Sequence, residues 1–197
     1  MRKTNITEEE RKWRIIESCK FIFNFGVIFY QQFDEYCHRV LGLSQSRSAF
    51  EILRERKLIR EIPFPKDPIL INRKKFYCLT KHGCHLIANE FDVSAYRVRT
   101  AHINYRHLNH NYELSKVYMT LINHFPSAKF ESDTALRRAM PITAKKTKIP
   151  DGRLTIPLEE GELKIGIEYE STIKSKRNMI MGADRYMDWF KNYNVDF

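Results

Sequence analysis

The sequence predicts an α+β protein of two domains: a helical domain that ends in a β-hairpin, and a smaller α/β domain. Apolar residues recur at helical spacing over much of residues 8–57, whereas strand-like alternation dominates from residue 153 to residue 170. A basic linker, residues 97–107, separates the two patterns. We therefore expect one domain over residues 1–96 and a second over residues 97–197.

Composition favours a polyanionic partner. Lys and Arg number 34 against 24 Asp and Glu, which gives a formal net charge of +10. Nucleic acid fits this charge better than a membrane surface, because the chain has no apolar run long enough to span a bilayer. The start of the chain also lacks the apolar core of a signal peptide, so a cytoplasmic protein is expected.

Three helices are predicted at the start of the chain. The first begins at the acidic run after Thr7, a suitable N-cap, and ends before Gly26. The second is expected over residues 29–40 and the third over residues 45–57, with Ser44 as its cap. Two helices joined by a short turn make a helix-turn-helix. The expected apolar side of the third helix consists of Ala49, Ile52 and Leu53.

A β-hairpin is predicted directly after the third helix. Residues 58–62 and 76–79 have strand character, and a basic, proline-bearing loop joins them. Thr80 follows the second strand and is placed to cap a fourth helix, with Gly83 three residues on. A helix-turn-helix followed by such a hairpin is a winged helix, and the step from strand to Thr-x-x-Gly resembles the end of many winged-helix domains. The alternative is a helical bundle with an incidental hairpin.

Double-stranded DNA is the predicted partner of this domain. Ser46 and Arg47, near the start of the third helix, are expected to reach base edges in the major groove. The other expected contacts lie further along that helix or in the hairpin loop, where cations suit phosphates; they are Arg54, Lys66, Arg73, Lys74 and Lys75.

Four cysteines lie in the first half of the chain without the paired spacing of a zinc ribbon or a disulfide framework. The densest group of metal-ligating residue types is Cys78, His82, Cys84 and His85. A zinc site there is disfavoured, because residues 82, 84 and 85 point in different directions on a helix.

The second half predicts a small α/β unit. A helix is expected over residues 110–124, strands over residues 130–133, 153–158 and 163–170, and a closing helix over residues 174–191. The expected apolar face of the first of these helices consists of His110, Leu114, Val117 and Leu121.

Three acids are predicted to converge in this unit. Glu168 and Glu170 would share one face of a strand, and a hairpin would return Asp151 to them. Such a cluster suits Mg²⁺ or Mn²⁺, which activates water for phosphodiester hydrolysis. Lys174 and Lys176 lie close enough in sequence to stabilise the developing charge, and Glu113 is a weaker fourth acid. The alternative is that Asp151 is a turn residue and that the other acids are solvated.

The same residues carry a family resemblance. Pro150-Asp151, Glu168-Tyr169-Glu170 and the lysines at 174 and 176 resemble the PD-(D/E)xK restriction-endonuclease-like superfamily, although Glu170 stands where the motif expects lysine. The whole chain resembles the replication-relaxation family of plasmid proteins, which includes the MobC-type relaxases. Its further similar strings are Tyr77-x-Leu79-Thr80-x-x-Gly83, His110-x-x-Glu113-Leu114, Glu168-x-Glu170-x-Thr172 and Arg185-Tyr186.

The resemblance implies a winged helix joined to a restriction-endonuclease-like domain that acts in plasmid mobilisation or replication. For the relaxase branch it implies metal-dependent nicking at a transfer or replication origin, alongside other relaxosome or conjugation proteins. The competing hypothesis is a catalytically inert accessory, replication or regulatory protein, whose second domain serves to form a homodimer or to clamp DNA.

Overall fold

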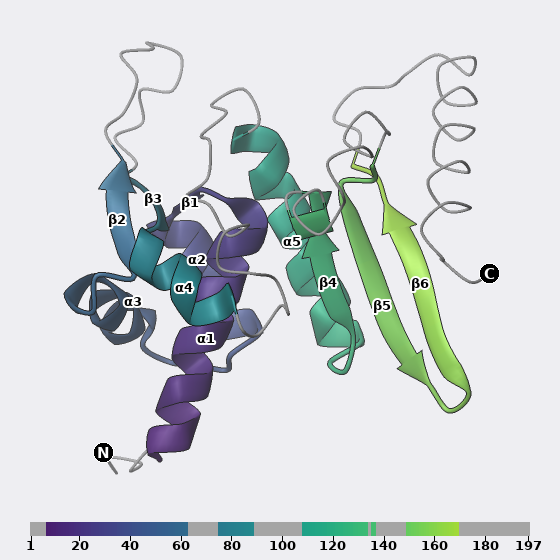
Figure 1. The fold of residues 1–197 in the computed structure, drawn as a ribbon, viewed down its shortest axis with the longest axis horizontal. Coiled ribbons are helices and arrows are strands. Elements are labelled where there is room, and N and C mark those ends of the chain that lie inside the picture. The colour runs from purple at the N-terminus through teal and green to yellow at the C-terminus, as the bar shows by residue number, and fades with distance from the viewer. Residues whose placement is uncertain (1–6, 63–74, 89–107, 134, 137–148, 170–197) are drawn as a thin grey trace. The chain divides into compact units, whose positions relative to one another are not determined.

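The computed structural model describes residues 7–62, 75–88, 108–133, 135–136 and 149–169. The chain divides into two compact units, residues 1–105 and residues 106–197 (Figure 1). The expected boundary at residues 96 and 97 lies outside the described residues, as does the predicted closing helix at residues 174–191.

Unit 1 contains mixed helix and sheet. Its elements are α1 (Glu8–Phe25), β1 (Ile28–Phe29), α2 (Tyr30–Arg39), α3 (Ser46–Glu55), β2 (Ile59–Ile62), β3 (Phe76–Leu79) and α4 (Lys81–Ala88). The three strands form an antiparallel sheet in the order β1-β3-β2. The sequence did not predict β1, because a strand of two residues is too short to show alternation and the second helix was expected to begin at Phe29.

The ends of two helices test the predicted caps. The Thr7 hydroxyl accepts a hydrogen bond from the Glu10 backbone N–H at 3.1 Å, so the cap of α1 is confirmed. The predicted cap of the third helix is wrong. Gln45, not Ser44, occupies the N-cap position of α3, and it makes no side-chain capping bond.

Aromatic side chains fill the core of unit 1. Phe21 of α1 stacks on Tyr36 of α2, with ring centroids 4.1 Å apart, and Phe50 of α3 meets Tyr77 of β3 edge-on at 4.7 Å. The apolar side of α3 was therefore predicted only in part: Leu53 is buried, but Phe50 supplies the main core contact. Ala49 and Ile52 are only half-buried, since the buried face is rotated by about one residue.

The junction of β3 and α4 confirms the predicted cap at Thr80. The Thr80 backbone N–H donates to the Leu58 carbonyl at 2.8 Å, and its hydroxyl accepts from the Gly83 N–H at 3.1 Å. A Cβ atom at Gly83 would lie 2.3 Å from the Leu58 carbonyl oxygen. The glycine therefore permits α4 to approach the start of the hairpin.

The four cysteines are all buried and unbridged. Cys84 lies on the buried side of α4, whereas His82 and His85 are exposed. No helix in the described part of the chain is long and apolar enough to cross a membrane.

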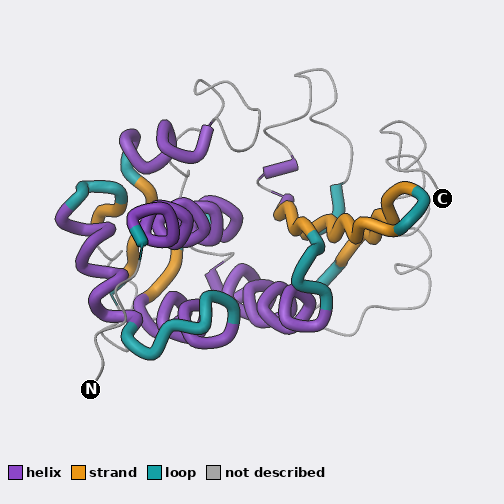
Figure 2. The backbone as a smooth tube through the Cα atoms, turned by 90° about the horizontal axis from the view of Figure 1, so that it is seen from below, coloured by secondary structure: helices purple, strands orange, loops and turns teal. Residues whose placement is uncertain are grey.

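Unit 2 packs a helix against an antiparallel sheet. Its elements are α5 (Leu108–His124), β4 (Lys129–Ser132), β5 (Gly152–Leu158) and β6 (Gly161–Ile167), and the strand order is β4-β5-β6 (Figure 1). Figure 2 shows the strands of this unit in orange. Tyr118 of α5 contacts Phe130 of β4, with ring centroids 5.0 Å apart. Of the four residues on the predicted apolar face of this helix, Leu114 alone is buried. The other buried residues of α5 are Leu108, Ser115, Tyr118 and Met119.

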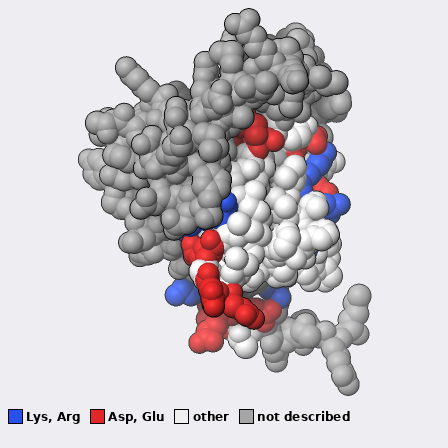
Figure 3. Space-filling model, turned by 90° about the vertical axis from the view of Figure 1, so that its right-hand side faces the viewer, with Lys and Arg blue, Asp and Glu red and all other residues white. Residues whose placement is uncertain are grey.

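The last strand is shorter and more exposed than predicted. It ends at Ile167, so Glu168 and Tyr169 follow it, and Glu170 lies outside the described residues. Two of its apolar side chains are exposed: Leu163 and Ile165 expose 44% and 40% of their surface. Figure 3 shows a broad uncharged surface beside acidic side chains on the side of unit 2 that carries β6.

Candidate functional site

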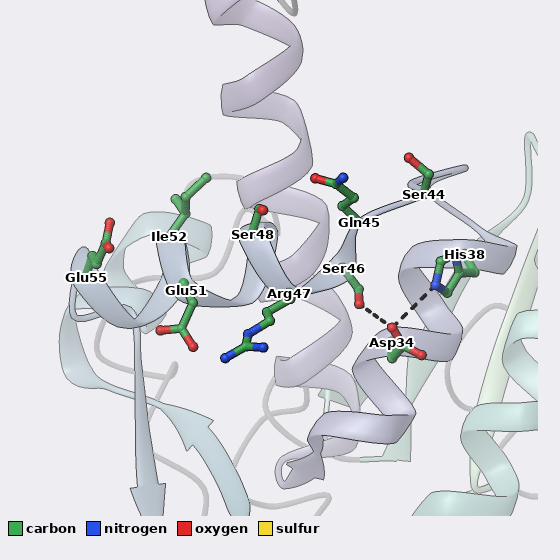
Figure 4. Close-up of a pocket in the computed structure, with 10 residues that line it drawn as sticks. All are labelled: Asp34, His38, Ser44, Gln45, Ser46, Arg47, Ser48, Glu51, Ile52 and Glu55. Atoms are coloured by element: carbon green, nitrogen blue, oxygen red, sulfur yellow. Dashed lines mark hydrogen bonds and ion pairs between the residues drawn. The ribbon is translucent and has the colours of Figure 1, made fainter. Parts of the chain in front are cut away.

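The start of α3 lines a pocket of about 670 Å³ in unit 1, together with residues of α2 and of the turn between the two helices (Figure 4). The side chains around it are almost all polar or charged. This is the surface for which the sequence predicted contacts with DNA bases.

Ser46 fixes α3 against α2 and has little surface for a ligand. Its hydroxyl donates to the Asp34 carboxylate and lies 3.1 Å from the Tyr30 hydroxyl, and the residue is only 4% exposed. The same carboxylate lies 3.4 Å from His38 Nε2 (Figure 4). Ser46 therefore positions the neighbouring Arg47, and its burial argues against the direct base contact expected from the sequence.

The cations of this surface differ in their partners. Arg47 is exposed and makes no hydrogen bond or ion pair within the described part of the chain. Arg54 instead donates to both Glu51 carboxylate oxygens, at 3.1 and 3.2 Å, and Lys75 pairs with Glu61 at 3.0 Å. The predicted wing residues Lys66, Arg73 and Lys74 lie outside the described residues.

A second candidate site lies in unit 2, where three elements meet around Asp151. Its Oδ2 atom accepts a hydrogen bond from the Tyr169 backbone N–H at 2.8 Å and lies 3.0 Å from Nε2 of His110. Asp151 precedes β5, Tyr169 follows β6, and His110 belongs to the first turns of α5. The hairpin register, which pairs Gly152 with Ile167, brings the two strand ends together as predicted.

The electrostatics of this site disfavour an ionised Asp151. Burial raises the pKa of its carboxyl above the usual range, and the charge of Glu168 raises this pKa further. The Tyr169 N–H and His110 act in the opposite direction, because both stabilise the carboxylate. Two acids, Asp151 and Glu168, thus interact unfavourably here.

The remaining predicted site residues are placed as follows. Glu113 pairs with Lys116 on the surface of α5 at 2.9 Å. Glu170, Lys174 and Lys176 lie outside the described residues. Within the described ranges, no three His, Cys, Asp or Glu side chains form a group that could hold a metal ion.

His110 is the residue whose position sequence reasoning understated. Its spacing placed it on the expected apolar face of a helix, where histidines are commonly local structural residues. No pattern in the sequence reveals that its ring reaches Asp151, because the two are 41 positions apart.

The donor set allows a limited test of the predicted metal. Asp151 and Glu168 supply carboxylate oxygens, which Mg²⁺ and Mn²⁺ accept, and a cation would relieve their repulsion. His110 is engaged with Asp151 and fits the role of an orienting partner better than that of a ligand. The two carboxylates fit such an ion, but the described residues do not complete its ligand set.

Comparison of the chain with protein-family models, curated proteins and solved structures gives no significant match.

Proposed function

We propose that unit 1 is a winged-helix module that binds double-stranded DNA, with α3 in the major groove. The observation that carries this proposal is Arg47, an exposed and unpaired cation on the second helix of a helix-turn-helix. An arginine in that position can bind guanine O6 and N7 through two donors, or bind a phosphate.

The surroundings of Arg47 support the same proposal. The order α2, turn, α3, β2, β3 places an antiparallel hairpin after the helix, as a wing requires. The hydrogen bonds of Ser46 to Asp34 and Tyr30 hold the start of α3 in place, which lowers the entropy cost of presenting Arg47. The formal net charge of +10 favours a polyanion.

The test compares Arg47→Ala with Arg54→Ala. Binding of a random-sequence duplex, and of duplexes selected from a random pool, is measured by fluorescence anisotropy at several salt concentrations. Arg47→Ala should weaken binding to the selected duplex by about 5- to 150-fold, the range for loss of a good base contact. Arg54→Ala should weaken it less, because Glu51 already neutralises this cation.

The outcome separates several possibilities. Equal losses for the two variants would remove the distinction between a paired and an unpaired arginine. Equal loss on selected and random duplexes would make Arg47 a phosphate contact. Duplex binding that is absent, or insensitive to salt, would overturn the proposal itself.

The second candidate function belongs to unit 2, which we propose to be a metal-dependent DNA nickase of the relaxase type. The observation that favours it is the meeting of Asp151, Glu168 and His110, three groups of the chemistry that hydrolytic sites use. Asp151 and Glu168, together with Glu170, would hold a Mg²⁺ or Mn²⁺ ion, and His110 would orient the Asp151 carboxylate. When bound, the ion would lower the pKa of a water nucleophile and polarise the phosphate.

The assignment to plasmid mobilisation or replication rests on the sequence motifs. An inert accessory or regulatory protein is the alternative. Nicking of supercoiled DNA and metal-dependent melting distinguish these two functions.

The nickase proposal predicts two effects of Asp151→Ala. Mn²⁺ should raise the melting temperature of the wild type but not of the variant, because an ion that binds the folded state stabilises it. Nicking of supercoiled DNA should be lost while duplex affinity is retained. Glu160→Ala, a change of one exposed acid in the β5–β6 turn, is the control and should behave as the wild type. A wild type that neither nicks nor responds to metal would favour the inert alternative.

A further inference from the structure

We propose that the exposed face of α1 joins two copies of this chain. Glu9, Lys12, Trp13 and Ile16 follow one another at positions i, i+3, i+4 and i+7, so they share one face of the helix. Trp13 exposes 49% of its surface. The first turns of α1 project beyond the other elements of unit 1 (Figure 1). An exposed tryptophan on a projecting helix is a typical centre of a protein interface.

The same face borders a groove of about 330 Å³. Its apolar lining residues include Ile16, Leu58 and Leu86, which come from α1, the start of the hairpin and α4. All ionisable residues that line it are basic: Lys12, Arg56 and His82. The groove therefore fits an apolar side chain that is accompanied by an acid.

The acids of α1 supply that charge. Glu8 pairs with Arg11 at 3.3 Å and Glu10 pairs with Arg14, each within the helix. Glu9 makes no such pair within the described residues, and neither does Lys12 or Arg56. One continuous surface thus carries an unpaired acid, an exposed tryptophan and a basic apolar groove.

Such a surface is complementary to itself, which is the requirement of a twofold interface. If two α1 helices pack antiparallel with the axis between Lys12 and Trp13, residue 9 of one copy faces residue 16 of the other. Arg56 and Ile16 line the same groove, so Glu9 of one copy would be brought to the groove that carries Arg56 in the second copy. Trp13 of each copy would lie against the groove of the other.

A DNA phosphate is the competing occupant of the basic rim. The acidic run Glu8, Glu9 and Glu10 on the same helix disfavours it, because these carboxylates would repel a phosphate backbone. A phosphate would also leave Trp13 exposed, because it offers no apolar surface against which the ring could pack.

The test measures self-association of the full chain by sedimentation equilibrium. Protein concentrations up to about 200 μM cover the dissociation constants of weak dimers. Trp13→Ala should weaken association by at least tenfold, as for an aromatic at the centre of an interface. Glu9→Arg and Arg56→Glu should each weaken it. The double variant Glu9→Arg/Arg56→Glu should recover most of the loss, because the charge pair is restored with reversed signs.

The controls separate association from folding. Trp13, Glu9 and Arg56 are exposed, so each variant should melt like the wild type when compared as a monomer. Glu160→Arg makes the same charge change as Glu9→Arg at a site far along the sequence in the β5–β6 turn, and it should not alter association.

Three results would overturn the proposal: a wild type that stays monomeric, association that is unchanged in Trp13→Ala, or single charge reversals that the double variant does not rescue. Reduced DNA affinity in Arg56→Glu, with no change in association, would assign the basic rim to phosphate instead.

Discussion

At the scale of the residue, Asp151 is a carboxyl group whose environment departs from that of an exposed carboxylate. Burial raises its pKa, and two hydrogen-bond partners only partly offset this effect. An acid whose pKa is higher in the folded state than in the unfolded state binds more protons when folded. Its contribution to the free energy of unfolding therefore falls as pH rises from the unfolded pKa to the folded pKa.

This linkage predicts a pH-dependent effect of Asp151→Asn. The variant removes the ionisable group, and its amide oxygen can still accept from the Tyr169 N–H. Relative to the wild type, Asp151→Asn should become more stable as pH rises from about 3.8 through the folded pKa of Asp151. Urea unfolding at a series of acid pH values without divalent metal measures this difference, with Glu160→Gln as the control. A difference between variant and wild type that is constant with pH would show that burial of Asp151 does not govern its titration.

Asp151 also shows how far the sequence predicted the site. The hairpin between residues 152 and 167 follows from alternation and a turn, so the approach of Asp151 to Glu168 could be predicted. The bond to His110 could not, because it depends on how α5 packs against the sheet. The burial of Ser46 could not be predicted for a similar reason, because it depends on Asp34 and Tyr30 of another helix, which hydrogen-bond to its side chain.

At the scale of the element, local rules predicted helices and strands well where a cap or a turn marked an end. Thr7 and Thr80 both cap the helices that they were expected to cap. Ser44 does not, because the chain enters α3 one residue later. Rotation of a helix about its axis was less predictable, as α3 and α5 show, since neighbouring aromatic residues decide which face is buried.

The Thr-x-x-Gly string acquires a physical explanation from its contacts. The Thr80 hydroxyl also donates to the Lys57 carbonyl at 2.6 Å, and Lys57 has a positive φ of 54° at the end of α3. Positive φ is unfavourable for a lysine, so the contact with Thr80 helps to hold the turn. The string therefore joins the end of α3, the start of the hairpin and α4, which is why it marks this fold element in a sequence.

At the scale of the whole molecule, net charge indicates the class of partner but not the residues that contact it. The formal charge of +10 includes cations that are already paired, such as Arg54 and Lys75. An exposed cation without an acidic partner binds a phosphate at a lower free-energy cost, because no existing ion pair has to be broken. Arg47 is therefore a better candidate than its exposed neighbours on the helix and hairpin.

The division into residues 1–105 and 106–197 predicts that the two proposed functions are separable. Each unit has its own buried apolar side chains, with Phe33 fully buried in one and Met119 fully buried in the other. Substitutions that share no partner usually have additive free-energy effects, to within about 0.5 kcal/mol. The double variant Arg47→Ala/Asp151→Ala should therefore bind duplex DNA as weakly as Arg47→Ala alone, and lack the metal-dependent rise in melting temperature as Asp151→Ala does. Anisotropy and thermal melting on the four proteins of this cycle measure both effects. A coupling free energy well above that limit in DNA affinity would mean that the Asp151 site contributes to DNA binding, and that the two units act as one.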